Sequence, residues 1–189
     1  MHNIIDFSNY LYKANTSYKF FLLYFLFDKI NYKKRDFTFR ELSCGIIAYS
    51  WKTLNEHNAP LNKNDKLFDL MVSAYSNFSD LTPYSSNNEV YDYFYNCNIS
   101  SINKKIYSLG LYAPYRLLVD NNLSKIIKNA DDWKKNKLIS DYSKNNNDCF
   151  YLIDHDTIII NTDYIEYISC NRNQLLLWIQ NKILERFSI

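Results

Sequence analysis

The densest group of side chains that could bind a metal ion is Asp154-His155-Asp156. Carboxylates and imidazoles are common ligands of divalent cations. The flanking segments 150–153 and 157–160 are rich in β-branched and aromatic residues, which predicts a β-hairpin with these three residues at its tip. Adjacent side chains at a hairpin tip point in different directions, so the pattern favours a turn over a metal site.

Motifs for other reactions are missing from the sequence. The three histidines, His2, His57 and His155, lie in a terminus, a loop and a turn, and none belongs to a nucleophile motif. There is no HExxH, no GxGxxG and no GxxxxGK[ST]. The cysteines lack CxxC spacing and are expected to be buried free thiols: Cys44, Cys97, Cys149 and Cys170. We therefore predict no catalytic residue, no metal and no cofactor, which favours a protein that is not an enzyme.

Lysine and arginine are concentrated locally, although the net charge is only +2. One basic group is the short link 32–36, and another is the stretch 101–137, where eight Lys and Arg residues face three Asp residues. Such side chains can contact nucleic-acid phosphates without reading sequence, although a solvated basic face would have the same composition. The candidate nucleic-acid-binding residues are Lys19, Lys33, Lys34, Arg35, Arg40, Lys104, Lys105 and Arg116.

The stretch 79–100 is acidic, rich in tyrosine and free of Lys and Arg. If its aromatic side chains are exposed, they would suit a protein partner, and if they fold inward they belong to the core. The candidate partner-binding residues are Tyr91, Tyr93, Phe94 and Tyr95.

Two amphipathic helices joined by the basic link would position these residues in the first part of the chain. The first begins after Thr16 or Ser17, and the second runs to about Trp51. Thr38 and Glu41 form a capping-box pattern at the start of the second helix. A pair of helices joined by a tight link resembles the first half of a helix-turn-helix unit. A further helix is expected from about residue 63 to residue 78.

The remaining elements complete a mainly α fold with a small β-hairpin. We expect a short helix within 1–14, a helix that begins near Pro114, the hairpin at about 149–161, and helices at 163–169 and from Arg172. The predicted architecture is a single domain over 1–189, a helical bundle with helix-turn-helix or winged-helix-like character and with halves at 1–80 and 100–189. The longest apolar run, 20–27, is too short to cross a bilayer and the N-terminus lacks a signal-peptide pattern, so we expect a cytoplasmic protein without membrane contact.

Several short segments, taken in order, resemble the N-terminal, non-nuclease region of bacterial HNH-endonuclease proteins found among restriction and phage-defence genes. The first segments are Thr16-Ser17-Tyr18-Lys19, Phe39-Arg40-Glu41-Leu42, Ile46-Ile47-Ala48-Tyr49-Ser50-Trp51 and Asn64-Asp65-Lys66-Leu67. They are followed by Pro114-Tyr115-Arg116-Leu117-Leu118, Ile158-Ile159-Ile160, Tyr164-Ile165 and the helix with Trp178. In that family the HNH finger follows the last helix, whereas this sequence ends at Phe187-Ser188-Ile189, so no nuclease residue carries over.

The resemblance implies a non-catalytic, DNA-engaging or assembly subunit of a bacterial antiphage or restriction complex. Its expected partners are other subunits, a nuclease or an ATPase or both, together with double-stranded DNA. A protein–protein adaptor without DNA contact is the alternative, favoured by the nearly neutral charge and the tyrosine-rich segment. A third hypothesis is a cryptic metal-dependent nuclease that would depend on Asp154 and Asp156.

Overall fold

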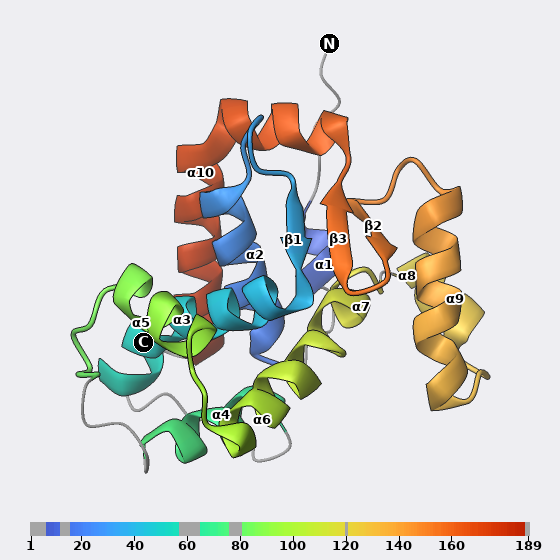
Figure 1. The fold of residues 1–189 in the computed structure, drawn as a ribbon. Coiled ribbons are helices and arrows are strands. Elements are labelled where there is room, and N and C mark those ends of the chain that lie inside the picture. The colour runs from blue at the N-terminus through green and yellow to red at the C-terminus, as the bar shows by residue number, and fades with distance from the viewer. Residues whose placement is uncertain (1–6, 12–15, 57–64, 76–80, 120, 188–189) are drawn as a thin grey trace.

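The computed structural model describes residues 7–11, 16–56, 65–75, 81–119 and 121–187 (Figure 1). These residues form a mainly helical fold with one small antiparallel sheet, which confirms the predicted fold class. The helices are α1 (Ser8–Leu11), α2 (Tyr18–Lys29), α3 (Phe39–Glu56), α4 (Lys66–Tyr75), α5 (Asn87–Tyr95), α6 (Ser100–Gly110), α7 (Ala113–Leu117), α8 (Asn121–Ile127), α9 (Asp132–Asn145) and α10 (Thr162–Phe187). The strands are β1 (Asp36–Thr38), β2 (Tyr151–Asp154) and β3 (Thr157–Ile160). No described helix is long and apolar enough to cross a membrane.

Helix α2 lies at the centre of the fold because it is apolar on nearly every side. Nine of its twelve residues are buried, which is the pattern of a core helix rather than of an amphipathic surface helix. Helices α3 and α10 both pack along it (Figure 1). The Phe21 ring stacks on that of Phe187, and the Phe25 ring meets that of Tyr49 edge-on. Aromatic side chains from both neighbouring helices therefore help to cover α2.

The start of α3 follows the predicted capping box. The Thr38 backbone N–H donates to Glu41 Oε2 at 2.7 Å, and the Glu41 backbone N–H donates to Thr38 Oγ1 at 3.2 Å. This exchange satisfies two backbone donors that a helix start would otherwise leave unpaired.

The sheet has three strands rather than the predicted two. The segment just before α3 forms β1, which pairs with β3 so that Phe37 lies opposite Ile158, and the strand order is β1-β3-β2. Three residues are too few for a visible alternating pattern, so the sequence did not reveal this strand. The hairpin itself is confirmed, with Asp154 opposite Thr157 and a two-residue turn between them. The winged-helix-like character stays a prediction.

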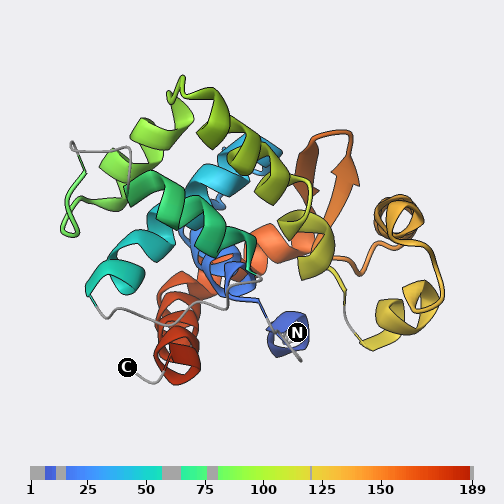
Figure 2. The same cartoon turned by 90° about the horizontal axis from the view of Figure 1, so that it is seen from below.

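The two edge strands of this sheet have different neighbours. At the β2 edge, Ser143 Oγ accepts from the Ile153 backbone N–H and Ser140 Oγ donates to the Ile153 carbonyl, each at 3.0 Å, so α9 covers that edge. In Figures 1 and 2, α8 and α9 lie together on this side of the molecule, away from α5. Strand β1 forms the opposite edge and lies beside α2 and the link that precedes it (Figure 1).

The close approach of α3 to α2 depends on a glycine. A Cβ atom at Gly45 would lie 2.5 Å from Cδ2 and 2.7 Å from Cδ1 of Phe25. The ring is itself buried between α3, β1 and α5, so it has little freedom to move.

We predict that Gly45→Ala destabilises the protein by about 1–3 kcal/mol because the added methyl group overpacks the α2–α3 contact. Helix propensity alone would favour alanine by up to about 1 kcal/mol, so the sign of the effect distinguishes packing from propensity. The free energy of unfolding from urea denaturation measures it. Asn181→Ala, on the exposed face of α10, is the matched control and should not destabilise. A Gly45→Ala variant as stable as the wild type would contradict this packing.

Candidate functional site

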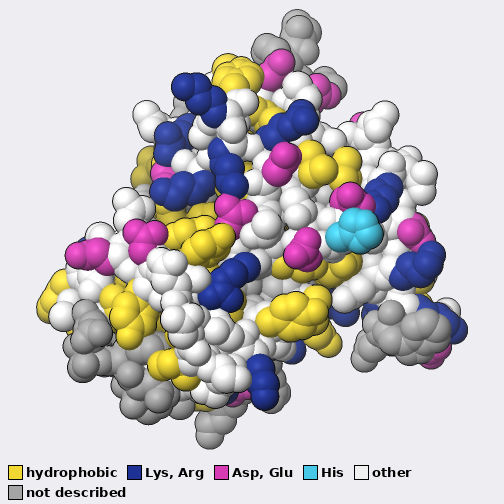
Figure 3. Space-filling model, viewed as in Figure 1, with side chains coloured by type: hydrophobic (Ala, Val, Ile, Leu, Met, Phe, Trp, Pro, Cys, Tyr) yellow, Lys and Arg dark blue, Asp and Glu magenta, His cyan; other side chains and the backbone are white. Residues whose placement is uncertain are grey.

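A groove of about 420 Å³ opens between α2, the link, the start of α3 and α5. Its floor is aromatic and includes Phe25, Phe37, Tyr49 and Tyr91, while Lys34 and other polar residues form its rim. Figure 3 shows hydrophobic side chains between charged ones on this face of the molecule. An apolar floor with a polar rim is the composition of a binding site for another molecule.

Parallel aromatic rings run from the groove to the surface. The ring of Tyr91 stacks on that of Phe25 at 6.1 Å and 14°, and on that of Tyr95 at 5.6 Å and 10°. The Arg40 guanidinium lies over the Tyr95 ring, 5.6 Å from its centre. Since Phe25 is buried and Tyr95 is 40% exposed, the stack links the core to a surface that a partner can touch.

Arg40, a candidate nucleic-acid contact, holds α5 in place. Its Nη2 donates to the Tyr95 carbonyl at 2.7 Å and to the Phe94 carbonyl at 3.3 Å, and its Nη1 donates to Asn103 Oδ1 at 3.1 Å. A cation is stabilising at a helix C-terminus, where the last carbonyls lack helical partners. Arg40 therefore fixes one wall of the groove.

Lys34 and Glu41 form the rim on the link side. Lys34 Nζ lies 2.7 Å from Glu41 Oε1 and 4.9 Å from the centre of the Phe37 ring. Burial alone would raise the pKa of the Glu41 carboxyl, but hydrogen bonds from Lys34 and Thr38 more than offset it and hold that pKa below its usual range. The capping carboxylate thus also neutralises the candidate phosphate contact Lys34.

Asp28 fixes the other end of the groove. Its carboxylate accepts a short hydrogen bond from Tyr49 Oη, and it pairs with Lys29 at 3.0 Å and with Arg172 at 2.6 Å. Burial would raise the pKa of Asp28, but the bonds from Tyr49, Lys29 and Arg172 lower it below the usual range. One carboxylate therefore ties α2 to α3 and α10, and sequence reasoning missed it because its partners are far apart in the chain.

The remaining candidate nucleic-acid residues do not form one continuous surface. Lys33 and Arg35 are exposed on the link, and Figure 3 shows Lys and Arg side chains gathered over that region. Arg35 Nε lies 3.6 Å from Asp36 Oδ1. Lys104 is exposed on α6, while its neighbour Lys105 donates to the Asp69 carbonyl at 3.1 Å. The structure thus brings Lys33, Lys34 and Arg35 together and separates them from α6.

Lys19 is buried, which corrects its assignment as a surface phosphate contact. Its side chain is 8% exposed, and Nζ reaches the Tyr10 carbonyl at 3.5 Å. Desolvation, with a smaller contribution from the charge of Arg116, lowers the pKa of Lys19 to about 8. Arg116 is half-buried on α7, with its guanidinium 5.2 Å from the centre of the Tyr112 ring. Neither side chain is placed to follow the backbone of a DNA duplex.

The four candidate partner-binding residues divide between core and surface. Phe94 is wholly buried and packs toward Trp51, so of the two alternatives for this side chain the core is the one observed, and Phe94 is not placed to touch a partner. Tyr93 is half-buried against Phe94. Tyr91 lines the groove and Tyr95 is exposed beside it. The helical period of 3.6 residues places Tyr91 and Tyr95 on one face of α5. This spacing was the signal in the sequence that could have identified the two residues as neighbours on one surface.

The hairpin tip is a turn. His155 has a positive φ of 51°, and Asp154 Oδ1 pairs with Lys144 at 2.7 Å. Among the described residues, no three His, Cys, Asp or Glu side chains gather in a way that could hold a metal ion.

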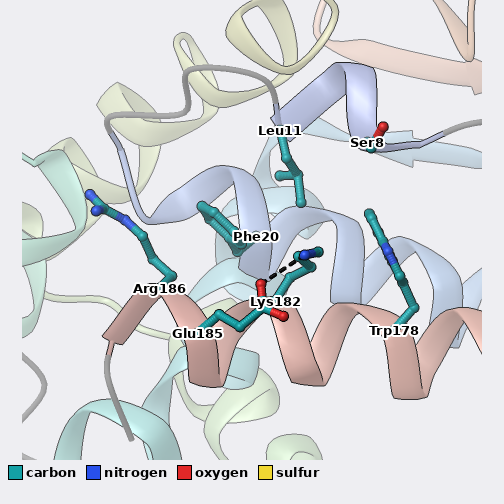
Figure 4. A pocket seen from close by; sticks show the side chains of 7 residues that line it. All are labelled: Ser8, Leu11, Phe20, Trp178, Lys182, Glu185 and Arg186. Atoms are coloured by element: carbon teal, nitrogen blue, oxygen red, sulfur yellow. Dashed lines mark hydrogen bonds and ion pairs between the residues drawn. The ribbon is translucent and has the colours of Figure 1, made fainter.

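A second groove, of about 430 Å³, lies between α1, α2 and α10 (Figure 4). Phe20, Leu11 and Trp178 form its apolar part, and Lys182 and Glu185 pair across its edge at 2.7 Å. Figure 4 shows Arg186 pointing away from this pair, at the far end of the groove. None of the predicted site residues lines it.

We predict that Lys19 makes stability rise with pH. Its folded pKa of about 8 lies below the ordinary 10.5, so between these values the unfolded chain binds more protons than the folded one, and the free energy of unfolding increases. From pH 7 to pH 10 the wild type should gain on the order of 2 kcal/mol relative to Lys19→Met. Urea denaturation in chloride buffer at both pH values measures this, with Lys104→Met, an exposed lysine, as the control. An equal pH response in wild type and Lys19→Met would contradict the placement of Lys19.

No protein-family model, no curated protein and no solved structure matches this chain. The resemblance to the N-terminal region of HNH-endonuclease proteins stays a prediction from the short ordered segments. What the chain does has to follow from the geometry of its surfaces, the aromatic groove first among them.

Proposed function

We propose that this chain is a non-catalytic assembly subunit that binds a partner protein through the aromatic groove. The observation that carries the proposal is the stack of Phe25, Tyr91 and Tyr95, which presents aromatic surface from a rigid core. Tyrosine and arginine are enriched at protein interfaces because they offer large contact area at low entropy cost. A groove already shaped by the fold also needs little ordering when a partner binds.

The charges around the groove favour a protein over a polyanion. Lys29 and Arg172 share Asp28, Lys34 pairs with Glu41, and Arg35 lies near Asp36. Each of these cations is thus partly neutralised within the fold. A rim of mixed, paired charges suits a partner with its own mixed rim, whereas nucleic acid is favoured by unpaired cations.

The resemblance noted in the sequence supplies the class of partner. We infer a place in a bacterial antiphage or restriction complex, where a nuclease or ATPase subunit would do the chemistry. In that arrangement this chain positions another subunit and breaks no bond itself.

We predict that Asn88→Arg lowers the affinity for the partner at least about tenfold, because Asn88 lines the groove and a long cation there blocks it. The chain is co-expressed with the products of the neighbouring genes, and the affinity for any that co-purify is measured by calorimetry. Asn181→Arg, an exposed asparagine of α10 outside the groove, is the matched control and should leave the affinity unchanged. An equal loss of affinity in both variants would contradict the proposal. So would a wild-type chain that co-purifies with none of those products.

Contact with duplex DNA is the second candidate function, favoured by the exposed cations on the link. Lys33 is exposed there and forms no ion pair with a described residue, and Arg35 pairs with Asp36 less closely, at 3.6 Å, than Lys34 does with Glu41, at 2.7 Å. Together with Lys34 they could neutralise two or three phosphates, which gives weak, salt-sensitive binding.

We predict that the double variant Lys33→Gln/Arg35→Gln weakens duplex binding and reduces the slope of log affinity against log salt by about 2. Fluorescence anisotropy at low salt, on the chain alone and with its partner, provides the measurement. Lys125→Gln/Lys128→Gln, an exposed pair in and just after α8, removes the same charge elsewhere and should change the slope less. If both double variants change the slope equally, or if the wild type does not bind the duplex at low salt, the proposed DNA contact through the link is contradicted.

A further inference from the structure

Two cations, Lys19 on α2 and Arg116 on α7, lie on helices that pack against each other, and neither forms an ion pair with a described residue. Lys19, in the first turn of α2, is 8% exposed, and the charge of Arg116 on α7 lowers its pKa further. Arg116 Nη1 is buried and has no hydrogen-bond partner. The carbonyl of Tyr10 at 3.5 Å is the acceptor that Lys19 Nζ reaches.

The buried carboxylate of Asp65 is engaged elsewhere. Asp65 accepts from the Ser17 backbone N–H at 2.7 Å, from Ser17 Oγ at 2.5 Å and from the Leu67 backbone N–H at 3.0 Å. It thereby joins the start of α2 to the start of α4. No ion pair joins it to Lys19 or Arg116, and the other titratable groups beside them, Tyr10 and Tyr18, are kept neutral because burial raises the pKa of each.

A third cation extends the cluster toward solvent. Lys66 Nζ lies 4.1 Å from the centre of the Tyr112 ring, and the Arg116 guanidinium lies 5.2 Å from the same centre. Tyr112 is 37% exposed, so this ring lies at the surface, whereas Lys19 is only 8% exposed. Lys66 also donates to Ser108 Oγ at 2.8 Å, which fixes its position.

Such an arrangement is unfavourable unless an anion joins it. A buried charge is normally paired, and a buried donor without an acceptor destabilises the fold. Phosphate is the oxyanion best suited to this group, because it carries charge to balance two cations and accepts from a guanidinium and an ammonium at once.

We propose that Lys19 and Arg116 form a phosphate-binding site, with its mouth beside Tyr112 and Lys66. Lys19 lies too deep for the continuous backbone of a duplex. The site therefore takes a small phosphate or the terminal phosphate of a longer molecule. The site shares no residue with the aromatic groove. A negative result for phosphate binding would therefore not contradict the proposed assembly function.

Thermal unfolding and calorimetry with inorganic phosphate test the site on the full chain. Phosphate is expected to raise the Tm of the wild type above its value in chloride of equal ionic strength, since a ligand that binds only the folded state stabilises it. Lys19→Met and Arg116→Gln should each remove this increase, while Lys104→Met should keep it. The pKa of the Lys19 ammonium, followed by NMR, should rise when phosphate is added to the wild type.

Single-stranded oligonucleotides distinguish the two sources of the phosphate. If the natural ligand is a terminal phosphate, a 5′-phosphorylated strand should bind at least about tenfold more tightly than the same strand without it, and Lys19→Met should abolish the difference. If only inorganic phosphate binds, the ligand is a small phosphate. No response of the wild type to either probe, or the same response in Lys19→Met, would overturn the proposal. If Arg116→Gln fails to fold, the Lys19→Met comparison and the Lys19 pKa still decide the outcome.

Discussion

Helix α2 is buried between α3 and α10, and the need to cover it determines how the other elements pack. Its apolar side chains leave only a few positions for solvent, so the protein can fold only by covering the helix on most of its surface. Gly45 allows α3 to approach closely, and Asp28 ties the C-terminal end of α2 to Tyr49 and Arg172. A carboxylate that joins three helices is favourable here because every one of its interactions is charge-assisted.

The surfaces that can bind other molecules follow from this packing. Phe25 and Phe37 form the floor of the groove because α2 and β1 meet there, and α5 adds Tyr91 as a wall. The first turn of the same helix holds the buried Lys19, and α7, which carries Arg116, packs against this helix. The two ends of α2 therefore offer different chemistry: an aromatic groove with paired charges at one end, and cations without a described counter-charge at the other. This separation is consistent with one surface for a partner protein and another for a small anion.

Much of the fold could be predicted from local patterns. The Thr38–Glu41 capping box, the β-hairpin with its tip at His155 and the break at Asn171 in the last helix each follow from a few neighbouring residues. Strand β1 could not be predicted because its partner, β3, is more than 100 residues away in the chain. The sequence left open whether Phe94 is exposed or buried and included Lys19 among the surface cations, because periodicity cannot say which face of a helix another element covers. The groove combines residues from both candidate sets, Lys34 and Tyr91, which no sequence pattern connected.

Amide hydrogen exchange, followed residue by residue, tests most directly whether α2 is the element on which the fold depends. If it is, the amides of residues 22–27 exchange only when the whole protein unfolds, with an opening free energy equal to that from denaturant unfolding. Helix α9, which packs mainly on the small sheet, should open at lower free energy. If the α2 amides exchange as readily as those of α9, α2 is not the anchor of the fold, and the account given for both ends of the helix fails.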